Sequence, residues 1–276
     1  MPELPEVETV RRGLLPAVRG RTITRVEPID FPGVLGDCSV AEASARLCGR
    51  VIIGIERRGK YLLFTLDDGA GFIVHLRMTG VLTIDDREAP PPRFHRLTIG
   101  LDDSRELRFA DQRKFGRVAP ASAESLAVLD RKLGPEPLST EFTADVLSER
   151  LRRRKAPIKA LLLDQGIVAG LGNIYVDEAL FLAGIHPAAP GAALSGEQVE
   201  ALHAAIRAVL VAGIEHRGTS FSSFRDAYGD KGSNQERLAV YGRGRQGAPC
   251  VRCGTPLVSM VLAGRGTSFC PSCQPV

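Results

Sequence analysis

The distribution of apolar and polar positions predicts a helix that begins within a few residues of the N-terminus. Apolar residues at positions 4, 7, 10 and 14 have the spacing of one helix face. Pro5 lies in the first turn, where its missing N–H is tolerated, and the acids at positions 3, 6 and 8 complement the positive end of the helix dipole. A helix therefore leads the chain.

Short segments rich in β-branched and apolar residues follow this helix. Glycine, proline and aspartate separate them, at spacings typical of antiparallel sandwiches and barrels. Residues 1–130 are therefore predicted to form a β domain with a leading helix. The predicted strands are 22–26, 51–57, 60–66, 71–78, 81–84, 96–101, 106–110 and 115–119.

The period of the pattern changes to that of helices after position 121. Residues 122–134 form a helical pattern that ends at Gly134, and Pro135 and Pro137 then indicate a linker over 131–140. Ser195 and Gln198 have the spacing of a capping box at the start of the last helix. The second domain is therefore predicted to be α-helical, with helices over 143–155, 157–165, 173–183 and 196–216.

Two glycine-rich stretches interrupt or follow these helices. Residues 165–173 contain three glycines and a candidate Asn173 cap, and their amides could hold a phosphate; a plain helix connector is the alternative. Residues 219–247 are polar and long enough to form a lid or recognition loop. We expect this second stretch to contact a ligand.

Composition places the chain among ordinary soluble proteins. Its 276 residues allow two domains and a small appendage, with 44% hydrophobic and 25% charged residues. No stretch is apolar for 18 residues, and the N-terminus is acidic, so we expect a cytoplasmic protein without a membrane span. The net charge of +4 favours a polyanion partner only weakly.

The segment from Arg150 to Lys159 concentrates six cations in ten residues. A solvated helix face is the usual explanation for such a run. Its place just before the glycine-rich turn favours phosphate binding instead, because guanidinium groups match phosphate geometry.

Four of the six cysteines form a metal-binding pattern. Cys250, Cys253, Cys270 and Cys273 make two CxxC pairs separated by sixteen residues. In a reducing compartment this spacing predicts one tetrahedral zinc site rather than disulfides. Between the pairs, two glycines surround Arg265 and suggest a tight turn that presents one cation, although the arginine can also be incidental to a β-turn.

The first residues can expose a nucleophile. The small Pro2 favours removal of the initiator methionine, which would leave a secondary amine. An α-amino group has an ordinary pKa of about 7.7 to 8.0, and a helix N-terminus lowers it, so much of the amine is neutral and reactive. Glu3 and Glu6 are a candidate general acid and a candidate orienting group, or else only partners of the helix dipole.

Seven motifs, in order from Pro2 to Gln274, resemble the bacterial formamidopyrimidine-DNA glycosylase family. They are PELPEVETVRRGL, RRGKYLLF, HLRMTG, FADQRKFGRV, LGPEPL, KALLLDQGIVAGLGNIYVDEALF and GRGTSFCPSCQ. The resemblance implies an α+β multidomain protein with three parts. These are an N-terminal antiparallel β-sandwich with a leading helix over 1–130, a helix-two-turn-helix domain with a lesion-recognition loop over 141–235, and a C-terminal zinc-finger β-hairpin over 236–276.

The family excises oxidised purines, namely 8-oxoguanine and formamidopyrimidines, and then cleaves the abasic strand by β- and δ-elimination. The resemblance therefore implies damaged double-stranded DNA as the partner and one structural zinc ion as the cofactor. A monomer that acts in the bacterial cytoplasm is expected.

The resemblance also implies a role for each catalytic residue. Pro2 attacks C1′ of a flipped nucleotide to form an iminium, and Glu3 protonates the sugar ring oxygen with Glu6 in support. Lys60 reaches the lesion phosphate and assists β-elimination; a surface lysine is the alternative. Arg265 binds phosphate and donates a proton in δ-elimination.

Met78, Arg113 and Phe115 match the residues that fill the gap left by the flipped base. Arg113 and Phe115 are predicted to point the same way on an extended segment, with Arg113 reading the orphaned base. The alternatives are a core aromatic for Phe115 and a core gap-filler for Met78. The other implied DNA contacts are His75, His95, Lys114, Arg154, Asn173 and Tyr241.

Two other functions compete with this interpretation. The sister endonuclease VIII family acts on oxidised pyrimidines, but it usually has glycine where Leu4 stands and lacks the Arg-x-Phe wedge. A zinc-finger protein that binds lesions without cutting is the second. A retained Met1 would produce that behaviour, because the Pro2 nitrogen would then be an amide.

Overall fold

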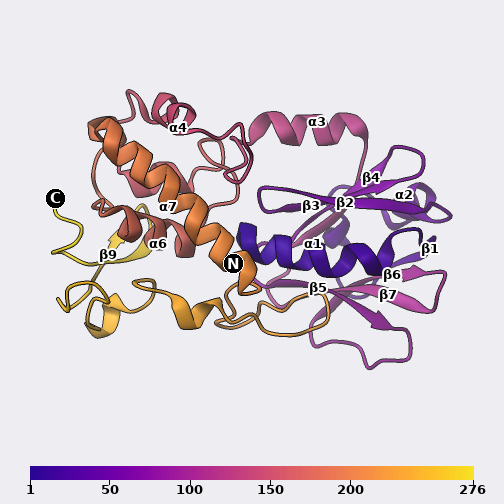
Figure 1. Ribbon diagram of the computed structural model, residues 1–276. Coiled ribbons are helices and arrows are strands. Elements are labelled where there is room, and N and C mark those ends of the chain that lie inside the picture. Colours follow the sequence, from indigo (N-terminus) through magenta and orange to yellow (C-terminus); the bar gives the residue numbers. More distant parts are fainter. The chain divides into compact units, whose positions relative to one another are not determined.

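The computed structural model describes residues 1–276 and divides into two units (Figure 1). Unit 1 comprises Met1–Arg131 and Ile214–Gln235, and unit 2 comprises Lys132–Gly213 and Glu236–Val276. The sequence pattern predicts that 214–235 belongs with the helices and that 236–276 is a separate domain. The structure groups the first segment with the strands and the second with the helices, where their apolar residues are buried.

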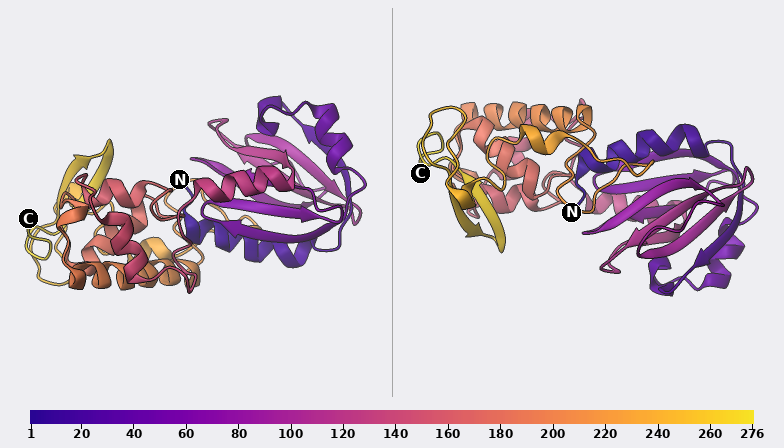
Figure 2. Two further views of the ribbon diagram at one scale, coloured as in Figure 1. Left: turned by 90° about the horizontal axis from the view of Figure 1, so that it is seen from above. Right: turned by 90° about the horizontal axis from the view of Figure 1, so that it is seen from below.

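Unit 1 contains two four-stranded antiparallel sheets (Figure 2). The strand orders are β1-β6-β7-β5 and β2-β3-β4-β8. All eight predicted strands are confirmed, with ends that differ by a few residues. They are β1 (Ile23–Pro28), β2 (Ile52–Arg58), β3 (Tyr61–Leu66), β4 (Gly71–His75), β5 (Gly80–Asp86), β6 (His95–Leu101), β7 (Arg105–Asp111) and β8 (Arg117–Ala121).

Alternation of apolar residues directs one face of each sheet to a shared core. In β3, Leu62, Phe64 and Leu66 are buried and the residues between them are half-buried. Phe64 stacks on Phe72 of β4 with ring centroids 4.1 Å apart. The core therefore lies between the two sheets.

Helices cover the open edges of the sandwich. Helix α1 (Leu4–Val18) contacts the edge strands β2 and β5, and its Val7, Val10 and Leu14 are fully buried, as its periodicity predicts. Helix α2 (Val40–Leu47) and the 3-10 helix η1 (Pro32–Leu35) contact β8, and α2 also contacts β1. Covered edges leave few unpaired main-chain groups for aggregation. Helix α3 (Ala123–Lys132) follows β8.

The segment 214–235 joins unit 1 through main-chain and apolar contacts. The backbone N of Ile84 in β5 donates to the Ala227 carbonyl oxygen at 2.9 Å, and Phe224 and Ala227 belong to the sandwich core. Gly13 of α1 makes room for this segment, since a Cβ there would lie 2.7 Å from the Ala227 side chain. The segment is thus anchored at its middle, which its polar composition did not reveal.

Unit 2 consists of short helices and one β-hairpin. The predicted helices are present as α4 (Ala144–Leu151), α5 (Ile158–Leu163), α6 (Asn173–Ala183) and α7 (Gly196–Glu215), whose last two residues belong to unit 1. Short 3-10 helices lie at η2 (Gly191–Ala193), η3 (Asn234–Arg237) and η4 (Gly244–Gln246). The hairpin pairs β9 (Val258–Leu262) with β10 (Arg265–Phe269). No helix is both long and apolar enough to cross a membrane.

Local signals explain the helix ends in unit 2. The predicted capping box is confirmed, since the Ser195 backbone N donates to Gln198 Oε1 at 2.9 Å and the Gln198 backbone N donates to Ser195 Oγ at 3.2 Å. Helix α4 ends at Leu151, four residues earlier than predicted, and Arg153 then adopts a left-handed conformation with φ 68°. The predicted Asn173 cap is wrong, because Gly172 occupies the cap position and Asn173 is the first helical residue.

Candidate active site and DNA interface

The start of α1 holds the residues proposed for the first chemical step. Pro2 and Glu3 are both buried, and Glu3 is the extended residue that precedes the helix, with φ −109° and ψ −169°. Glu6 in the first turn is 1% exposed, and its Oε2 accepts a hydrogen bond from the Glu3 backbone N at 2.8 Å. Met1 precedes Pro2, so the Pro2 nitrogen becomes an amine only when Met1 is removed.

The other Glu6 oxygen binds the base of the 219–235 segment. Oε1 accepts from the Thr219 backbone N at 2.7 Å. Thr219 Oγ1 in turn accepts from Asn234 Nδ2 at 2.9 Å, and the Ser220 backbone N donates to Gln235 Oε1 at 2.8 Å. A carboxylate held on both oxygens by main-chain donors orients groups and is poorly placed to transfer protons. Glu6 therefore positions the helix start and the segment base together.

Lys60 lies in the two-residue loop between β2 and β3. Arg58 pairs with Tyr61 across this hairpin, and Gly59 takes the left-handed conformation, φ 55°, that such a tight loop needs. Lys60 itself is only 6% exposed. It is therefore a buried cation at a sheet end and not an ordinary surface lysine.

His75 ends β4 beside this hairpin. Its ring meets Tyr61 edge to face with centroids 4.4 Å apart, and its Nδ1 accepts from the Arg77 backbone N at 2.9 Å. Burial, assisted by the charges of Arg77 and Lys60, lowers the pKa of His75 to about 3. His75 is thus neutral near pH 7 with its proton on Nε2, where it can act as a hydrogen-bond donor.

The three candidate wedge residues lie on two turns at one end of the sandwich. Met78 occupies the turn between β4 and β5, and Arg113 and Phe115 occupy the turn between β7 and β8. The prediction of an extended 113–115 segment is wrong, because Lys114 between them has φ 57°. The two side chains nevertheless meet, with the Arg113 guanidinium 4.6 Å from the Phe115 ring centroid. Phe115 is 48% exposed, which excludes a core aromatic.

In unit 2, the β9–β10 hairpin presents Arg265. Ala263 and Gly264 form its two-residue turn with φ of 51° and 69°, and Arg265 begins the returning strand in an exposed position. The Gly266 carbonyl oxygen accepts from Asn173 Nδ2 at 2.9 Å and from Lys159 Nζ at 3.1 Å. The hairpin that carries Arg265 is therefore attached to α5 and α6.

A cavity of about 320 Å3 lies beside this hairpin. Asn173 and Tyr241 line it, together with Arg245, which the sequence had not suggested. Asn173 Oδ1 is buried without a hydrogen-bond partner, which is uncommon in a finished interior and fits a site that a ligand or water completes. The sequence signal for Arg245 was its place among glycines just before the first zinc knuckle.

Glu178 is a second positioning residue that sequence reasoning missed. It is 7% exposed on α6, and its carboxylate accepts from the backbone N of Ala239, Val240 and Tyr241 at 2.8 to 2.9 Å. These bonds fix the segment that carries Tyr241. An acid in the middle of the apolar stretch 174–181 was the available signal.

The basic run 150–159 divides into structural and exposed cations. Lys159 is fully buried and pairs with Asp177 of α6 at 2.6 Å, and Arg150 donates to the Gly166 carbonyl oxygen at 2.8 Å. These two are wrong as phosphate candidates, because their charges are used inside unit 2. Arg154 is exposed after the end of α4.

Two further predicted DNA contacts have partners within unit 1. His95 Nε2 lies 3.1 Å from both the Leu97 carbonyl oxygen and the Thr98 hydroxyl, so the ring is tied to its own strand. Lys114 pairs with Asp30 at 3.2 Å. His95 is thus the weaker candidate, and Lys114 would have to exchange its carboxylate for a phosphate.

The four zinc-pattern cysteines converge at the end of unit 2. Their sulfur atoms all lie within 4.8 Å of one another, with Cys253 and Cys270 3.5 Å apart and Cys250 and Cys273 3.9 Å apart. Tetrahedral zinc with bonds of about 2.3 Å requires sulfur separations of roughly 3.8 Å. No disulfide forms, and the cluster fits one structural zinc ion as predicted.

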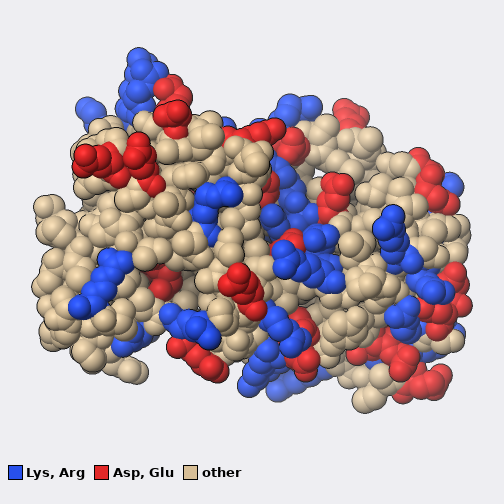
Figure 3. All heavy atoms as spheres, in the orientation of Figure 1, with Lys and Arg blue, Asp and Glu red and all other residues tan.

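Charged side chains of both signs are interspersed over the face of each unit in Figure 3. The molecule therefore has no single-sign surface on that face, in keeping with a net charge of only +4. Specific cations rather than a general field must account for binding to a polyanion.

Three family profiles together match most of the chain. Residues 1–118 match the formamidopyrimidine-DNA glycosylase N-terminal domain, residues 133–225 match its H2TH domain, and residues 247–276 match a zinc finger found in FPG and IleRS. The formamidopyrimidine-DNA glycosylase of Chloroflexus aurantiacus is 50% identical over 99% of this chain and 98% of its own length. The chain belongs to the formamidopyrimidine-DNA glycosylase family.

Other relatives agree with this assignment. The formamidopyrimidine-DNA glycosylase of Symbiobacterium thermophilum is 52% identical and covers 100% of this chain and 90% of its own length. A solved structure of the complex between Lactococcus lactis Fpg and an abasic site containing DNA is 39% identical over 99% of this chain and 100% of that one, with a TM-score of 0.92. The family fold, with its sandwich, helical domain and zinc finger, is therefore confirmed, and the endonuclease VIII alternative is not supported.

Proposed function

We propose that this formamidopyrimidine-DNA glycosylase, once Met1 is removed, excises oxidised purines from double-stranded DNA with the Pro2 nitrogen as nucleophile. The observation that carries the proposal is the arrangement at the start of α1. Pro2 and Glu3 are adjacent and buried, and Glu6 holds the Glu3 backbone N at 2.8 Å. Such fixed geometry suits a nucleophile and a general acid that act on one sugar.

In the first step, the neutral Pro2 nitrogen attacks C1′, the bond from C1′ to the base breaks, and the departing base takes up a proton while the Pro2 nitrogen releases its own. Glu3 protonates the ring oxygen, and the sugar opens to an iminium that joins C1′ to Pro2. The positive nitrogen then acidifies the C2′ protons. Loss of one C2′ proton expels the 3′ phosphate, loss of the C4′ proton then expels the 5′ phosphate, and hydrolysis of the iminium frees the enzyme.

Several cations bind phosphates of the DNA during these steps. Lys60, which is buried and lies close enough to His75 for its charge to affect that ring, binds the lesion phosphate and assists β-elimination. Arg265, Asn173 and Tyr241 supply the phosphate contacts of unit 2, with Arg265 as the proton donor in δ-elimination. Arg154 and Lys114 add contacts along the backbone, and His95 contributes least.

Met78, Arg113 and Phe115 fill the gap left by the flipped base. An exposed phenylalanine under a guanidinium is costly in water but gains stacking between bases. Arg113 reads the orphaned base. The segment 219–235, whose Thr219 backbone N donates a hydrogen bond to Glu6, forms the recognition loop over the lesion.

Zinc supports this function without taking part in the chemistry. Cys250, Cys253, Cys270 and Cys273 would hold the ion, which stabilises the hairpin when bound. The hairpin carries Arg265, so the metal acts through the position of that cation. We propose a monomer in the cytoplasm.

Borohydride trapping on a duplex with 8-oxoguanine opposite cytosine tests the mechanism. Intact mass first establishes removal of Met1, and peptide mapping then locates the adduct. An adduct at Pro2 supports the proposal, whereas an adduct at Lys60 keeps the glycosylase but replaces the nucleophile. Tight lesion binding without any adduct, by protein with a free Pro2, would favour the non-catalytic sensor.

A matched variant separates the two chemical roles. Glu3→Gln removes the general acid needed while the base is attached, but an abasic sugar has no base to lose and its hemiacetal ring opens to the aldehyde without the enzyme. We expect this variant to lose 8-oxoguanine excision and to retain trapping on preformed abasic DNA. Equal loss on both substrates would contradict the role of Glu3.

A further inference from the structure

One buried carboxylate, that of Asp111, joins the two turns that carry the wedge residues. Asp111 is the last residue of β7 and is 1% exposed. Its Oδ2 accepts from the backbone N of Phe115 at 2.8 Å and of Gly116 at 2.7 Å. Its Oδ1 accepts from the Arg113 backbone N at 3.2 Å and from the Thr79 hydroxyl.

The first three bonds set the path of the Arg113–Phe115 turn. Lys114 has φ 57°, a left-handed conformation that is unfavourable for a residue with a side chain. Three main-chain donors aimed at one carboxylate offset this cost, since hydrogen bonds to a charged acceptor are stronger than neutral ones. Gly116 completes the turn because a Cβ there would lie 2.4 Å from the Phe109 ring.

The fourth bond reaches the other turn. Thr79 follows Met78 in the turn that the Gly80 backbone N closes by donating to the Leu76 carbonyl oxygen at 2.9 Å. Thr79 Oγ1 also accepts from the Arg113 backbone N at 3.2 Å. Thr79 and Asp111 thus tie Met78 to Arg113 and Phe115.

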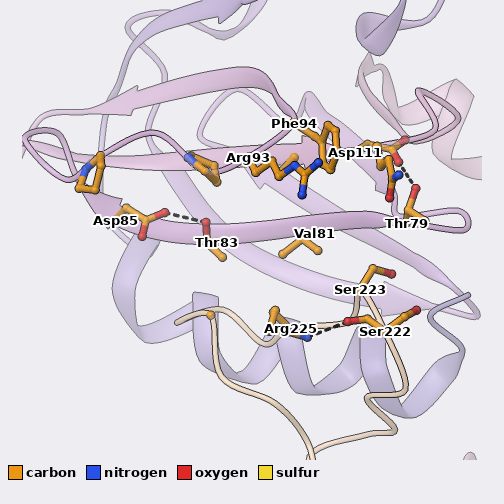
Figure 4. Close-up of a pocket in the computed structure, with 15 residues that line it drawn as sticks. Thr79, Val81, Thr83, Asp85, Arg93, Phe94, Asp111, Ser222, Ser223 and Arg225 are labelled. Atoms are coloured by element: carbon orange, nitrogen blue, oxygen red, sulfur yellow. Dashed lines mark hydrogen bonds between the residues drawn. The ribbon is translucent and has the colours of Figure 1, made fainter.

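Figure 4 places this pair at one end of a cavity in unit 1. The cavity measures about 680 Å3 and is lined by the outward residues of β5, by Phe94 and by Ser222, Ser223 and Arg225. Neither Pro2, Glu3 nor Lys60 lines it. The Thr79–Asp111 bond therefore lies apart from the chemical groups, and its effect must come through the turns.

We propose that Asp111, with Thr79, is a positioning residue that sets Met78, Arg113 and Phe115 in the conformation in which they enter DNA. This inference rests on the proposed function, and it names the residues that set the conformation of the three wedge residues. A preset wedge needs no ordering when it replaces a flipped base, so base extrusion is the step that Asp111 accelerates. Strand cleavage at a site that already lacks its base depends on it less.

Two variants test this inference. Asp111→Asn replaces one acceptor oxygen by a donor that faces main-chain N–H groups. Thr79→Val removes the hydroxyl, with its bonds to Asp111 and from the Arg113 backbone N, and leaves the three main-chain bonds to Asp111 in place. Asp102→Asn is the matched control, since Asp102 is an exposed carboxylate in the turn at the opposite end of β7. Single-turnover excision of 8-oxoguanine, incision of preformed abasic DNA, and fluorescence of a 2-aminopurine beside the lesion are measured for each.

We expect both variants to slow 8-oxoguanine excision by about 10- to 100-fold, because a base step that the wedge does not fill loses its stacking. The 2-aminopurine signal of base extrusion should slow in parallel, while abasic incision falls less than about threefold and Asp102→Asn matches the wild type. Normal excision by Thr79→Val would overturn the inference even if Asp111→Asn unfolds. Equal loss of excision and abasic incision in Thr79→Val would also overturn it, since the effect would then lie outside extrusion. Wild-type protein without either activity would instead overturn the proposed function.

Discussion

Glu6 and Thr219 are joined by a 2.7 Å hydrogen bond although they are 213 positions apart in the sequence. The bond links the first turn of α1, next to the proposed nucleophile, to the base of the recognition loop. The same carboxylate also holds the Glu3 backbone N. Loop position and the geometry of the proposed catalytic residues are therefore coupled through one side chain.

Glu6→Gln should uncouple them. The amide can accept from only one of the two main-chain donors and places its own N–H groups against the other, which costs about 1 to 3 kcal/mol. We expect a roughly 10- to 100-fold loss in 8-oxoguanine excision with a folded protein, measured by single-turnover kinetics and thermal unfolding. Glu42→Gln, which alters an exposed capping box in α2, serves as the control. A wild-type excision rate in Glu6→Gln would show that the bond carries no function.

His75 should make stability fall at acid pH. Its pKa is about 6.5 unfolded and about 3 folded, so the folded state resists protonation. The contribution is complete above pH 6.5 and is lost as pH falls from 6.5 toward 3. Between pH 7 and pH 5 we expect the wild type to lose about 2 kcal/mol relative to His75→Gln in urea unfolding. If the free energy of unfolding changes with pH in the same way in both proteins, the lowered pKa of His75 is wrong.

The imidazole of His75 also has a spectroscopic signature. Nitrogen NMR of the folded protein should show a neutral ring with its proton on Nε2 at pH 7, because Nδ1 accepts from Arg77. The same state should persist at pH 5. A charged His75 ring at pH 6 would contradict the lowered pKa, which depends on burial of the ring and on the nearby charge of Lys60.

Glu178→Gln should loosen the segment that carries Tyr241. Three main-chain N–H groups converge on this carboxylate, and a glutamine oxygen cannot satisfy all three. We expect faster amide exchange at residues 239–241 and about tenfold weaker binding to abasic-analogue DNA. Glu197→Gln, a change in the first turn of α7, should leave both unchanged. Unaltered exchange at 239–241 would exclude the positioning role.

Zinc removal should act on unit 2 first. Native mass spectrometry is expected to find one zinc per chain, and Cys253→Ser should lower both zinc content and DNA affinity, since metal binding stabilises such small hairpins. Cys38→Ser, in unit 1, is the control. If metal-free protein binds DNA with full affinity, the zinc-stabilised hairpin does not contribute to DNA binding.

Arg265 should contribute one phosphate contact. Arg265→Gln is expected to reduce the slope of log affinity against log salt by about 1, measured by fluorescence anisotropy between about 50 and 200 mM salt. Arg46→Gln, a change at an exposed arginine in the last turn of α2, should leave the slope unchanged. An unchanged slope in Arg265→Gln would place its side chain away from the backbone.

Local sequence patterns predict much of the fold. Eight strands, the leading helix, the helices of unit 2 and the zinc cysteines all follow from local periodicity, capping and spacing. The glycines on both sides of Arg265 suggest a tight turn there, and the structure has a two-residue turn at Ala263 and Gly264 with Arg265 as the first residue of the returning strand. The predicted end of α4 is wrong because the helical pattern continues past Leu151, whereas the helix stops there and Arg153 adopts a left-handed backbone conformation.

The sequence by itself determined the elements, the metal ligands and, through its motifs, the family, since each depends on neighbouring residues or on a fixed spacing. Only the tertiary structure decided which carboxylates organise the site and which cations are free to act. The carboxylates that do so are those of Glu6, Asp111 and Glu178, which bind groups from other elements or turns. Lys159 forms a buried ion pair with Asp177. The physical reason is that burial and hydrogen-bond partners come from distant segments, which local sequence patterns do not specify.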